Sequence, residues 1–259
     1  MSRIFRHAIV KPPSATFADG LTTAGLGRPS YGLALEQHRR YCEALSARGV
    51  AIHPLLPDPG HPDSTFVEDT AVITARGAIV TRPGAASRVG EVRAVRDALG
   101  AFFPRLGSIE PPGTLDGGDT CEVGGHVLIG ISSRTNEAGA EQLGRWLLDG
   151  GITSSLVDIR GIPRLLHLRA GLAWLGGRGL AVAASLDADP ALSGYERIVV
   201  PDGEAYAANC ILVNGGVLLP SGHPGFERSL REAGFDVEAI DMSEFEKMDG
   251  GLSCLSLRF

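Results

Sequence analysis

Cysteine is scarce in this sequence and long hydrophobic runs are absent, and each shortage excludes a class of protein. The 259 residues include four cysteines, Cys42, Cys121, Cys210 and Cys254, without the close CxxC spacing of zinc or redox sites. Four are also too few for a disulfide-stapled scaffold, so we expect a reducing, cytoplasmic location. No stretch approaches the roughly 20 apolar residues that span a bilayer, and the N-terminus carries no apolar segment of signal-peptide length. We therefore expect neither secretion nor membrane insertion.

Positive charge is not in excess either. The chain has 24 basic and 30 acidic residues, a net charge of -6, so it lacks the overall positive field that attracts nucleic acid or anionic lipid. With 44% hydrophobic and 21% charged residues and a mean hydropathy of +0.09, it has the composition of a globular protein rather than a disordered one. The only proline-rich stretch, 53–62, is short enough to be a loop, so we expect one domain over residues 1–259.

Glycine, by contrast, is abundant, with 35 residues dispersed along the chain. Four segments share one pattern, in which two short apolar or β-branched runs flank a glycine-bearing turn, and this pattern predicts β-hairpins. The turns recur at intervals of roughly 40 to 50 residues, which indicates a repeat architecture. The predicted hairpins are Thr70–Thr81, Cys121–Gly130, Leu172–Ala184 and Cys210–Pro220.

Helical spacing of apolar residues follows three of these hairpins, and a further strand-like run follows two of the helices. The repeating unit is therefore predicted to be ββαβ, with helices expected at 90–99, 136–148 and 226–233. A fifth unit has to be assembled from both ends of the chain, because 4–10 and 253–258 are strand-like and lack local partners. The helical segment 31–48 and the strand-like segment 52–56 complete it. We thus predict an α/β fold of five ββαβ units around a pseudo-fivefold axis, closed by pairing of the terminal strands.

Residues with catalytic chemistry recur just before the hairpins and the closing strand. Carboxylates precede the first two hairpins, His167 precedes the third, and Cys254 ends the segment 249–254 before the closing strand. A thiol beside an imidazole that a carboxylate orients is the arrangement of an activated nucleophile, and further acidic groups favour a cationic ligand. Each residue alone also fits a structural role, since buried cysteine and histidine are common in cores. Cys42 lies on a predicted helix, Cys121 and Cys210 open hairpins without a polar neighbourhood, and all three are interpreted as packing residues.

Several motifs, in this order and spacing, resemble the dimethylarginine dimethylaminohydrolases of the guanidino-modifying superfamily, which have the pentein, or α/β-propeller, fold. The resemblance covers nearly the whole chain. It rests on DGLT at 19–22, DS at 63–64 with FVED at 66–69, TRPG at 81–84 with SR at 87–88, LDGGD at 115–119, SRTN at 133–136, LHL at 166–168, YAANC at 206–210 and DGGLSCLSLRF at 249–259.

The resemblance implies hydrolysis of Nω-methylated arginine to citrulline and an amine, without a metal or organic cofactor. Cys254 would attack the guanidinium carbon to give a covalent thiouronium, His167 would protonate the departing amine and then activate water, and Asp116 would orient His167. The substrate-binding residues that it implies are Asp63, Glu68 and Asp69 at the guanidinium, Arg88 and Arg134 at the α-carboxylate, and Leu21 and Met248 through their carbonyls at the α-amine. Leu21 would also lie on a glycine-flanked lid, 20–27.

Alternatives from the same superfamily and beyond stay open. An arginine deiminase would be longer by a helical insertion and would carry Arg where Glu68 stands, and an agmatine deiminase would not need paired arginines. A non-catalytic pentein, such as the ribosome anti-association factor, would have a degraded site. The thiol and imidazole could also capture zinc as an inhibitor. We expect a small-molecule substrate and no nucleic-acid or membrane partner; the oligomeric state is open, with a homodimer as one candidate.

Overall fold

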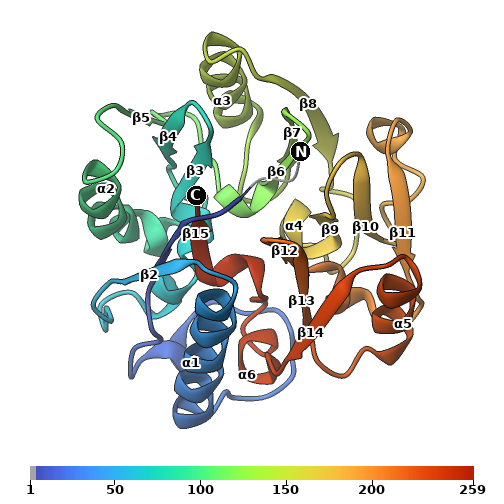
Figure 1. Ribbon diagram of the computed structural model, residues 1–259. Coiled ribbons are helices and arrows are strands. Elements are labelled where there is room, and N and C mark those ends of the chain that lie inside the picture. The colour runs from blue at the N-terminus through green and yellow to red at the C-terminus, as the bar shows by residue number, and fades with distance from the viewer. Residues whose placement is uncertain (1–3) are drawn as a thin grey trace.

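The computed structural model describes residues 4–259, whose strands form five three-stranded sheets arranged in a ring (Figure 1). Each sheet consists of an antiparallel pair and a third strand that lies parallel to the middle one. The sheets comprise β3 Ala71–Thr74, β4 Gly77–Val80 and β5 Leu106–Ser108; β6 Thr120–Val123, β7 His126–Ile131 and β8 Thr153–Asp158; β9 Leu172–Trp174, β10 Gly179–Ala183 and β11 Glu196–Val200; β12 Ile211–Val213, β13 Gly216–Pro220 and β14 Asp236–Ile240; and β15 Ser256–Arg258, β1 His7–Val10 and β2 Ala51–Pro54.

The fifth sheet joins the two ends of the chain, as the sequence predicts. Strand β1 pairs antiparallel with β15 and parallel with β2. Residue Ile9 lies opposite Leu257 in this register, and both side chains are buried. The pairing places the turn that carries Cys254, immediately before β15, at the centre of the ring.

Four longer helices lie on the outside of the ring (Figure 1): α1 Tyr31–Ala47, α2 Val92–Gly100, α3 Glu137–Asp149 and α5 Pro224–Glu232. Helix α3 starts where the sequence predicts, because the Asn136 side chain accepts a hydrogen bond from Gly139 N, 2.8 Å away, and caps the first turn. The two short α-helices are α4 Leu168–Gly171 and α6 Ser243–Glu246. No helix in the described part of the chain is long and apolar enough to cross a membrane.

The third unit departs from the predicted ββαβ pattern. Its middle and third strands, β10 and β11, are joined through a single 3-10 turn, Pro190–Leu192, in place of an outer helix. The turn begins at Asp189, whose side chain accepts a hydrogen bond from Ala191 N, and Pro190 occupies its first position. The segment 184–195, which connects these two strands, therefore contains no α-helix.

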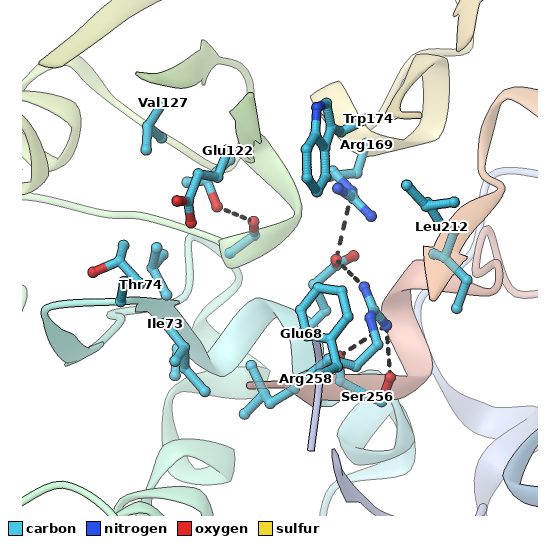
Figure 2. A pocket seen from close by; sticks show the side chains of 18 of the residues that line it. Glu68, Ile73, Thr74, Glu122, Val127, Arg169, Trp174, Leu212, Ser256 and Arg258 are labelled. Carbon is cyan, nitrogen blue, oxygen red and sulfur yellow. Dashed lines mark hydrogen bonds and ion pairs between the residues drawn. The ribbon is translucent and has the colours of Figure 1, made fainter. Parts of the chain in front are cut away.

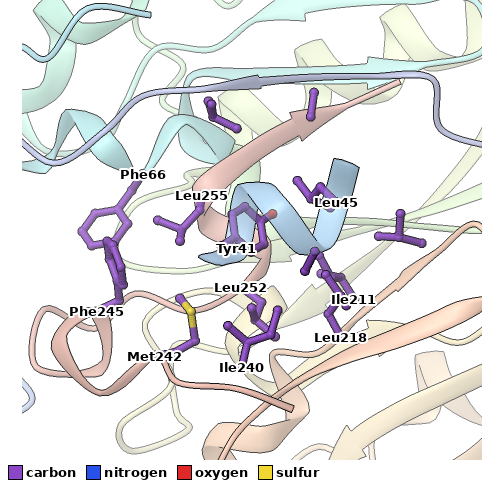
Figure 3. Packing of buried hydrophobic residues seen from close by; sticks show 14 of the residues in the cluster. Tyr41, Leu45, Phe66, Ile211, Leu218, Ile240, Met242, Phe245, Leu252 and Leu255 are labelled. Atoms are coloured by element: carbon purple, nitrogen blue, oxygen red, sulfur yellow. The ribbon is translucent and has the colours of Figure 1, made fainter. Parts of the chain in front are cut away.

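Apolar side chains within residues 4–259 form five clusters, and each cluster joins two neighbouring units. In the largest, α1 packs against strands of the fourth and fifth units (Figure 3), with Tyr41 and Leu45 facing Ile211 and Leu218. Because this packing continues from each unit to the next all the way round, burial of apolar area stabilises the ring as a whole.

Candidate active site

Five short helical turns, one before the first strand of each unit, meet at the centre of the ring. Neighbouring turns contact one another around the axis, which brings together residues that are far apart in the sequence. They are Val67–Thr70 before β3, Gly117–Asp119 before β6, α4 before β9, Ala205–Ala208 before β12 and Ser253–Leu255 before β15. The repeated architecture therefore explains why candidate catalytic residues recur at the hairpin entries.

A narrow cavity of about 30 Å³ lies among these turns. It brings together eight of the ten site residues expected from the sequence, namely Leu21, Asp63, Asp69, Arg88, Arg134, His167, Met248 and Cys254. Phe66, Leu166, Asp249 and Gly250 complete its lining. The other two expected residues, Glu68 and Asp116, do not line this cavity.

His167 lies at the start of α4 and is buried beside three carboxylates. Its Nε2 atom is 3.0 Å from Asp116 Oδ2 and 3.9 Å from Asp69 Oδ1. Burial disfavours the imidazolium, but the charge of Asp69, the hydrogen bond to Asp116 and the charge of Asp119 outweigh it and raise the pKa of His167 to about 10. At neutral pH the ring is therefore a cation that can donate a proton.

Asp116 is fully buried behind His167, which explains why it does not line the cavity. One carboxylate oxygen contacts His167 and the other accepts a hydrogen bond from Gly84 N at 2.8 Å. Its backbone N donates to Thr135 Oγ1 at 3.1 Å. These contacts fix the carboxylate, so Asp116 is placed to orient the imidazole rather than to touch a substrate.

Cys254 lies in the 3-10 turn Ser253–Leu255, just before the closing strand as expected, although the strand starts at Ser256 and not at the predicted Ser253. Its Sγ atom is 3.4 Å from Gly251 N and 3.9 Å from the Asn209 amide nitrogen. Burial and the charges of Glu68 and Asp69 raise the pKa of the thiol to about 12. In the absence of a bound cation, the thiol is therefore protonated at neutral pH.

Asp63 and Asp69 place carboxylates at one side of the cavity. Asp63 accepts the backbone N–H of Leu21 at 3.0 and 3.2 Å, and burial raises its pKa. Burial also acts to raise the pKa of Asp69, but the charges of His167 and Arg88 outweigh it and hold that pKa below its usual value. Asp69 is thus ionised within a buried network.

Glu68, the neighbour of Asp69 in the same turn, points away from the narrow cavity. Its Oε2 accepts a hydrogen bond from Ser253 Oγ at 2.6 Å, and its Oε1 lies 3.6 Å from Arg169 Nε. It lines a second, larger cavity. Glu68 therefore lies behind Cys254, where its charge acts on the thiol although its side chain does not line the narrow cavity among the turns. That narrow cavity is the turn-lined site.

Arg88 and Arg134, which were both expected at the substrate α-carboxylate, differ in whether their guanidinium groups already have partners. Arg88 is buried and its guanidinium is occupied by Asp69, at 2.5 Å, and by both oxygens of Glu91. Arg134 is partly exposed, and its side chain forms no hydrogen bond or ion pair within residues 4–259. Arg134 is therefore the arginine available to an incoming carboxylate, whereas Arg88 would first have to exchange one of its partners.

The predicted lid, 20–27, is fastened over the cavity by its own polar groups. Thr22 Oγ1 donates to Lys247 O at 2.7 Å, and Thr23 N donates to Asp249 Oδ2 at 2.5 Å. Leu21, held by Asp63, lines the cavity although its side chain is 44% exposed. Gly25 and Gly27 have positive φ angles of 67° and 89°, conformations that favour glycine.

Two positioning residues were missing from the sequence prediction, although their motifs were noted. Asp119 is fully buried and accepts hydrogen bonds from Ser132 Oγ, Thr135 Oγ1 and Leu168 N, so it ties the start of α4 to the loop that carries Arg134. Asn209 follows the turn of the fourth unit. Asn209 could have been identified from its position, because it lies before a hairpin in the same place as the catalytic candidates of the other units.

Asn209 connects the segment of His167 with the turn of Cys254. Its Oδ1 accepts a hydrogen bond from Ser253 N at 2.9 Å, and its Nδ2 donates to Arg169 O at 3.2 Å. The same Nδ2 is the group that approaches Cys254 Sγ. One buried amide thus sets the relative position of both segments.

Asp69, Asp116 and His167 also satisfy the spacing of a metal site, because their ligand atoms lie within 4.8 Å of one another. Within the structure, however, the Asp69 and Asp116 oxygens already serve Arg88, Gly118, Gly84 and His167. Hydrogen bonding and ion pairing therefore account for the cluster.

No family model matches the chain. Among curated proteins, it is 43% identical over 257 residues to an N(G),N(G)-dimethylarginine dimethylaminohydrolase of Pseudomonas aeruginosa, covering 99% of this chain and 100% of that protein. It is 34% identical over 255 residues to the Streptomyces coelicolor protein of the same name, with 98% and 96% covered.

A solved structure of the Pseudomonas aeruginosa enzyme, a cysteine-to-serine mutant in complex with citrulline, superimposes with a TM-score of 0.96 at 42% identity, covering 99% of this chain and 100% of that one. The five-unit ring is accordingly the pentein fold that the sequence predicts. Full-length identity of this degree, together with the shared fold, establishes the family. The chain is a member of the dimethylarginine dimethylaminohydrolase family.

Proposed function

We propose that this protein hydrolyses Nω-methylated arginine, in its asymmetric dimethyl and monomethyl forms, to citrulline and dimethylamine or methylamine. The observation that carries the proposal is that a thiol, an imidazole fixed by a buried carboxylate, and two further carboxylates converge on one narrow cavity. The relatives named for this reaction match the chain over their whole length. A planar cation with a leaving amine is the substrate class that such a set of groups suits.

Binding of the cation releases the Cys254 thiol proton to solvent, and the thiolate Sγ then attacks the guanidinium carbon. A C–S bond forms, the C–N bond to the methylated nitrogen breaks, and the imidazolium of His167 donates its proton to the departing amine. The neutral imidazole then removes a proton from water, whose oxygen attacks the thiouronium carbon. The C–S bond breaks and the added hydroxyl loses its proton, which releases citrulline; the leaving sulfur takes up a proton to become a thiol again, and the imidazole keeps the proton that it removed from water.

The charges of the site suit this sequence. His167 has a raised pKa and is protonated at neutral pH, so the acid for the first step is present before the substrate binds. The Cys254 thiol has a raised pKa because of burial and the neighbouring carboxylates, and a guanidinium placed against it supplies the opposite charge that stabilises the thiolate. Deprotonation of the nucleophile is therefore coupled to binding of the cationic substrate.

The substrate would lie with its guanidinium toward Asp63 and Asp69, with Glu68 contributing its charge from behind Cys254. Its α-carboxylate would be held by Arg134, and by Arg88 after an exchange of partners. Leu21 and Met248 would present backbone carbonyls to the α-amine. This orientation places each charged group of the substrate against groups of opposite charge or polarity: the guanidinium against carboxylates, and the α-carboxylate against arginine.

The lid has to open for binding. A cavity of about 30 Å³ has room for only a few water-sized volumes, far less than an amino acid requires. The hydrogen bonds of Leu21 to Asp63, Thr22 to Lys247 and Thr23 to Asp249 must break and re-form in each cycle. Closure then excludes water from the thiouronium until hydrolysis.

The test is citrulline release from asymmetric dimethylarginine and from arginine, measured with wild type and Cys254→Ser in the presence of a chelator. Turnover of the methylated substrate that persists with chelator and is lost in the variant is the expected result. Turnover confined to arginine would assign the chain to deiminase chemistry, and no citrulline from folded protein would overturn the proposal. The cytoplasmic location and a homodimeric state stay predictions.

A further inference from the structure

A second cavity, of about 460 Å³, lies along the ring axis beyond the five turns (Figure 2). Each unit contributes its first strand to the wall, through Ile73, Glu122, Trp174, Leu212 and Leu257. None of the described residues lines both this axial cavity and the turn-lined site. Its volume lies in the range of small-molecule binding pockets, about 300 to 1,000 Å³.

The end of the axial cavity nearest the turns carries two arginines and one carboxylate. Glu68 Oε1 lies 3.6 Å from Arg169 Nε and 4.0 Å from Arg258 Nη2, so a single oxygen serves both guanidinium groups at long range (Figure 2). The buried Nε of Arg169 makes no hydrogen bond with any described residue. The only hydrogen bond of the Arg169 side chain in the described chain is from Nη1 to Cys121 Sγ, at 3.7 Å, and sulfur is a weak acceptor.

This end of the cavity therefore has one positive charge in excess, carried by two arginines that line it. A carboxylate balances that charge, because guanidinium groups bind carboxylate oxygens through charge-assisted hydrogen bonds. The walls farther along the axis are apolar or aromatic at Ile73, Val127, Trp174 and Leu212. Glu122, on the same wall, disfavours a second negative charge on a ligand.

We propose that the axial cavity binds a small monocarboxylate with an apolar or aromatic body, whose carboxylate contacts Arg169 and Arg258. The apolar body lies against Trp174 and Leu212. The ligand differs from the substrate of the turn-lined site, since it needs no cationic group. The cavity is thus a second binding site rather than an extension of the first.

Glu68 couples the two sites. The carboxylate that faces Arg169 and Arg258 also accepts the hydrogen bond of Ser253, the residue next to the nucleophile. A bound anion would draw the arginines from Glu68 and place a second negative charge behind Cys254, which disfavours the thiolate. Occupancy of the axial cavity should therefore lower kcat without competing with the substrate.

Binding is tested by calorimetric titration of wild-type protein with 3-phenylpropanoate in the presence of saturating citrulline. We expect saturable binding that citrulline does not displace, and at least about tenfold weaker binding of 3-phenylpropanamide, because the neutral amide loses about 1.4 kcal/mol or more of charge-assisted bonding. Three results would each overturn the proposal: displacement of the ligand by citrulline, equal affinity for the acid and the amide, or no binding of the acid at 10 mM. That concentration is of the order of the dissociation constants of weak ligands.

Variants place the site. Leu212→Phe fills the apolar part of the cavity and should abolish binding, whereas Leu156→Phe, at an exposed position on β8, should leave it unchanged. Unchanged binding by folded Leu212→Phe would contradict the assignment, and the acid–amide comparison on wild type stays decisive if that variant does not fold. The predicted inhibition rests on the proposed hydrolase activity, whereas the binding measurement does not. Failure of the axial-site proposal can therefore be distinguished from failure of the proposed function.

Discussion

Replacing Glu68 by glutamine should make the Cys254 thiol more acidic. Ser253 Oγ lies 2.6 Å from Glu68 Oε2 and 3.9 Å from Cys254 Sγ, so the carboxylate and the sulfur are at most about 6.5 Å apart. At an effective dielectric constant of about 20, unit charges at that separation repel by about 2.5 kcal/mol, which corresponds to a pKa difference of about 1.9. Glutamine keeps an oxygen that can accept the Ser253 hydrogen bond, so the substitution removes the charge and preserves the contact.

The measurement is the pH dependence of Cys254 alkylation by iodoacetamide in the unliganded protein, followed by peptide mass spectrometry. The wild-type thiol has a pKa raised to about 12, and the variant should show a value lower by about 1.9. The thiolate fraction at neutral pH then rises about 80-fold, but a less basic thiolate is less nucleophilic. The net gain in alkylation rate is therefore about tenfold.

The control is Glu141→Gln, which removes the same charge from an exposed position on α3 and should leave the alkylation profile unchanged. An unchanged or higher thiol pKa in Glu68→Gln would refute the reasoning. It would mean that burial and the charge of Asp69 raise the thiol pKa and that Glu68 does not act on the nucleophile.

Three further substitutions test the site. Asp116→Asn should lower kcat about 10²- to 10⁴-fold with little change in KM. It should also shift the alkaline limb of the pH profile of kcat to lower pH, because His167 loses the charge that supports its raised pKa. An unchanged alkaline limb would contradict this role. Arg134→Met should raise KM about 10- to 100-fold while kcat is largely kept, whereas the exposed Arg145→Met should not, as steady-state kinetics on asymmetric dimethylarginine would show. Asn209→Ala should slow turnover about tenfold and alter the pH profile of Cys254 alkylation, and the conservative Asn209→Ser should recover part of the rate; a change in thermal stability alone would assign Asn209 to packing.

The fold was predictable from the sequence where local chemistry and periodicity agree. Glycine turns marked the hairpins, and the N-cap at Asn136 marked the start of α3. Strand β5, Leu106–Ser108, was not predicted, because three residues are too few to show alternation; the five-residue strand β11 was missed as well, because its sequence ERIVV does not alternate between polar and apolar residues. In the third unit, the short Pro190–Leu192 turn stands where a helix was implied by repetition alone.

The candidate site was predictable in its residue types and only partly in its geometry. Glu68 and Asp69 are adjacent in the sequence, and nothing in their identities indicates that one turn directs them to different cavities. Arg88 resembles Arg134 in the sequence, but Glu91, three residues later, occupies its guanidinium in the folded chain. Side-chain partners of this kind depend on tertiary contacts and have no signature in composition or spacing.

The ring gives the protein a physical reason to couple its two cavities. Each of the five central turns is closely followed in the chain by a strand that lines the axial cavity, so the turn and the wall of the cavity belong to one unit. Apolar clusters between units hold the strands in place, which limits how far a ligand can displace them. Electrostatic coupling through Glu68 needs no such displacement, because charge acts across the 2.6 Å contact with Ser253. A rigid propeller can therefore transmit occupancy of its axis to the nucleophile through a single carboxylate.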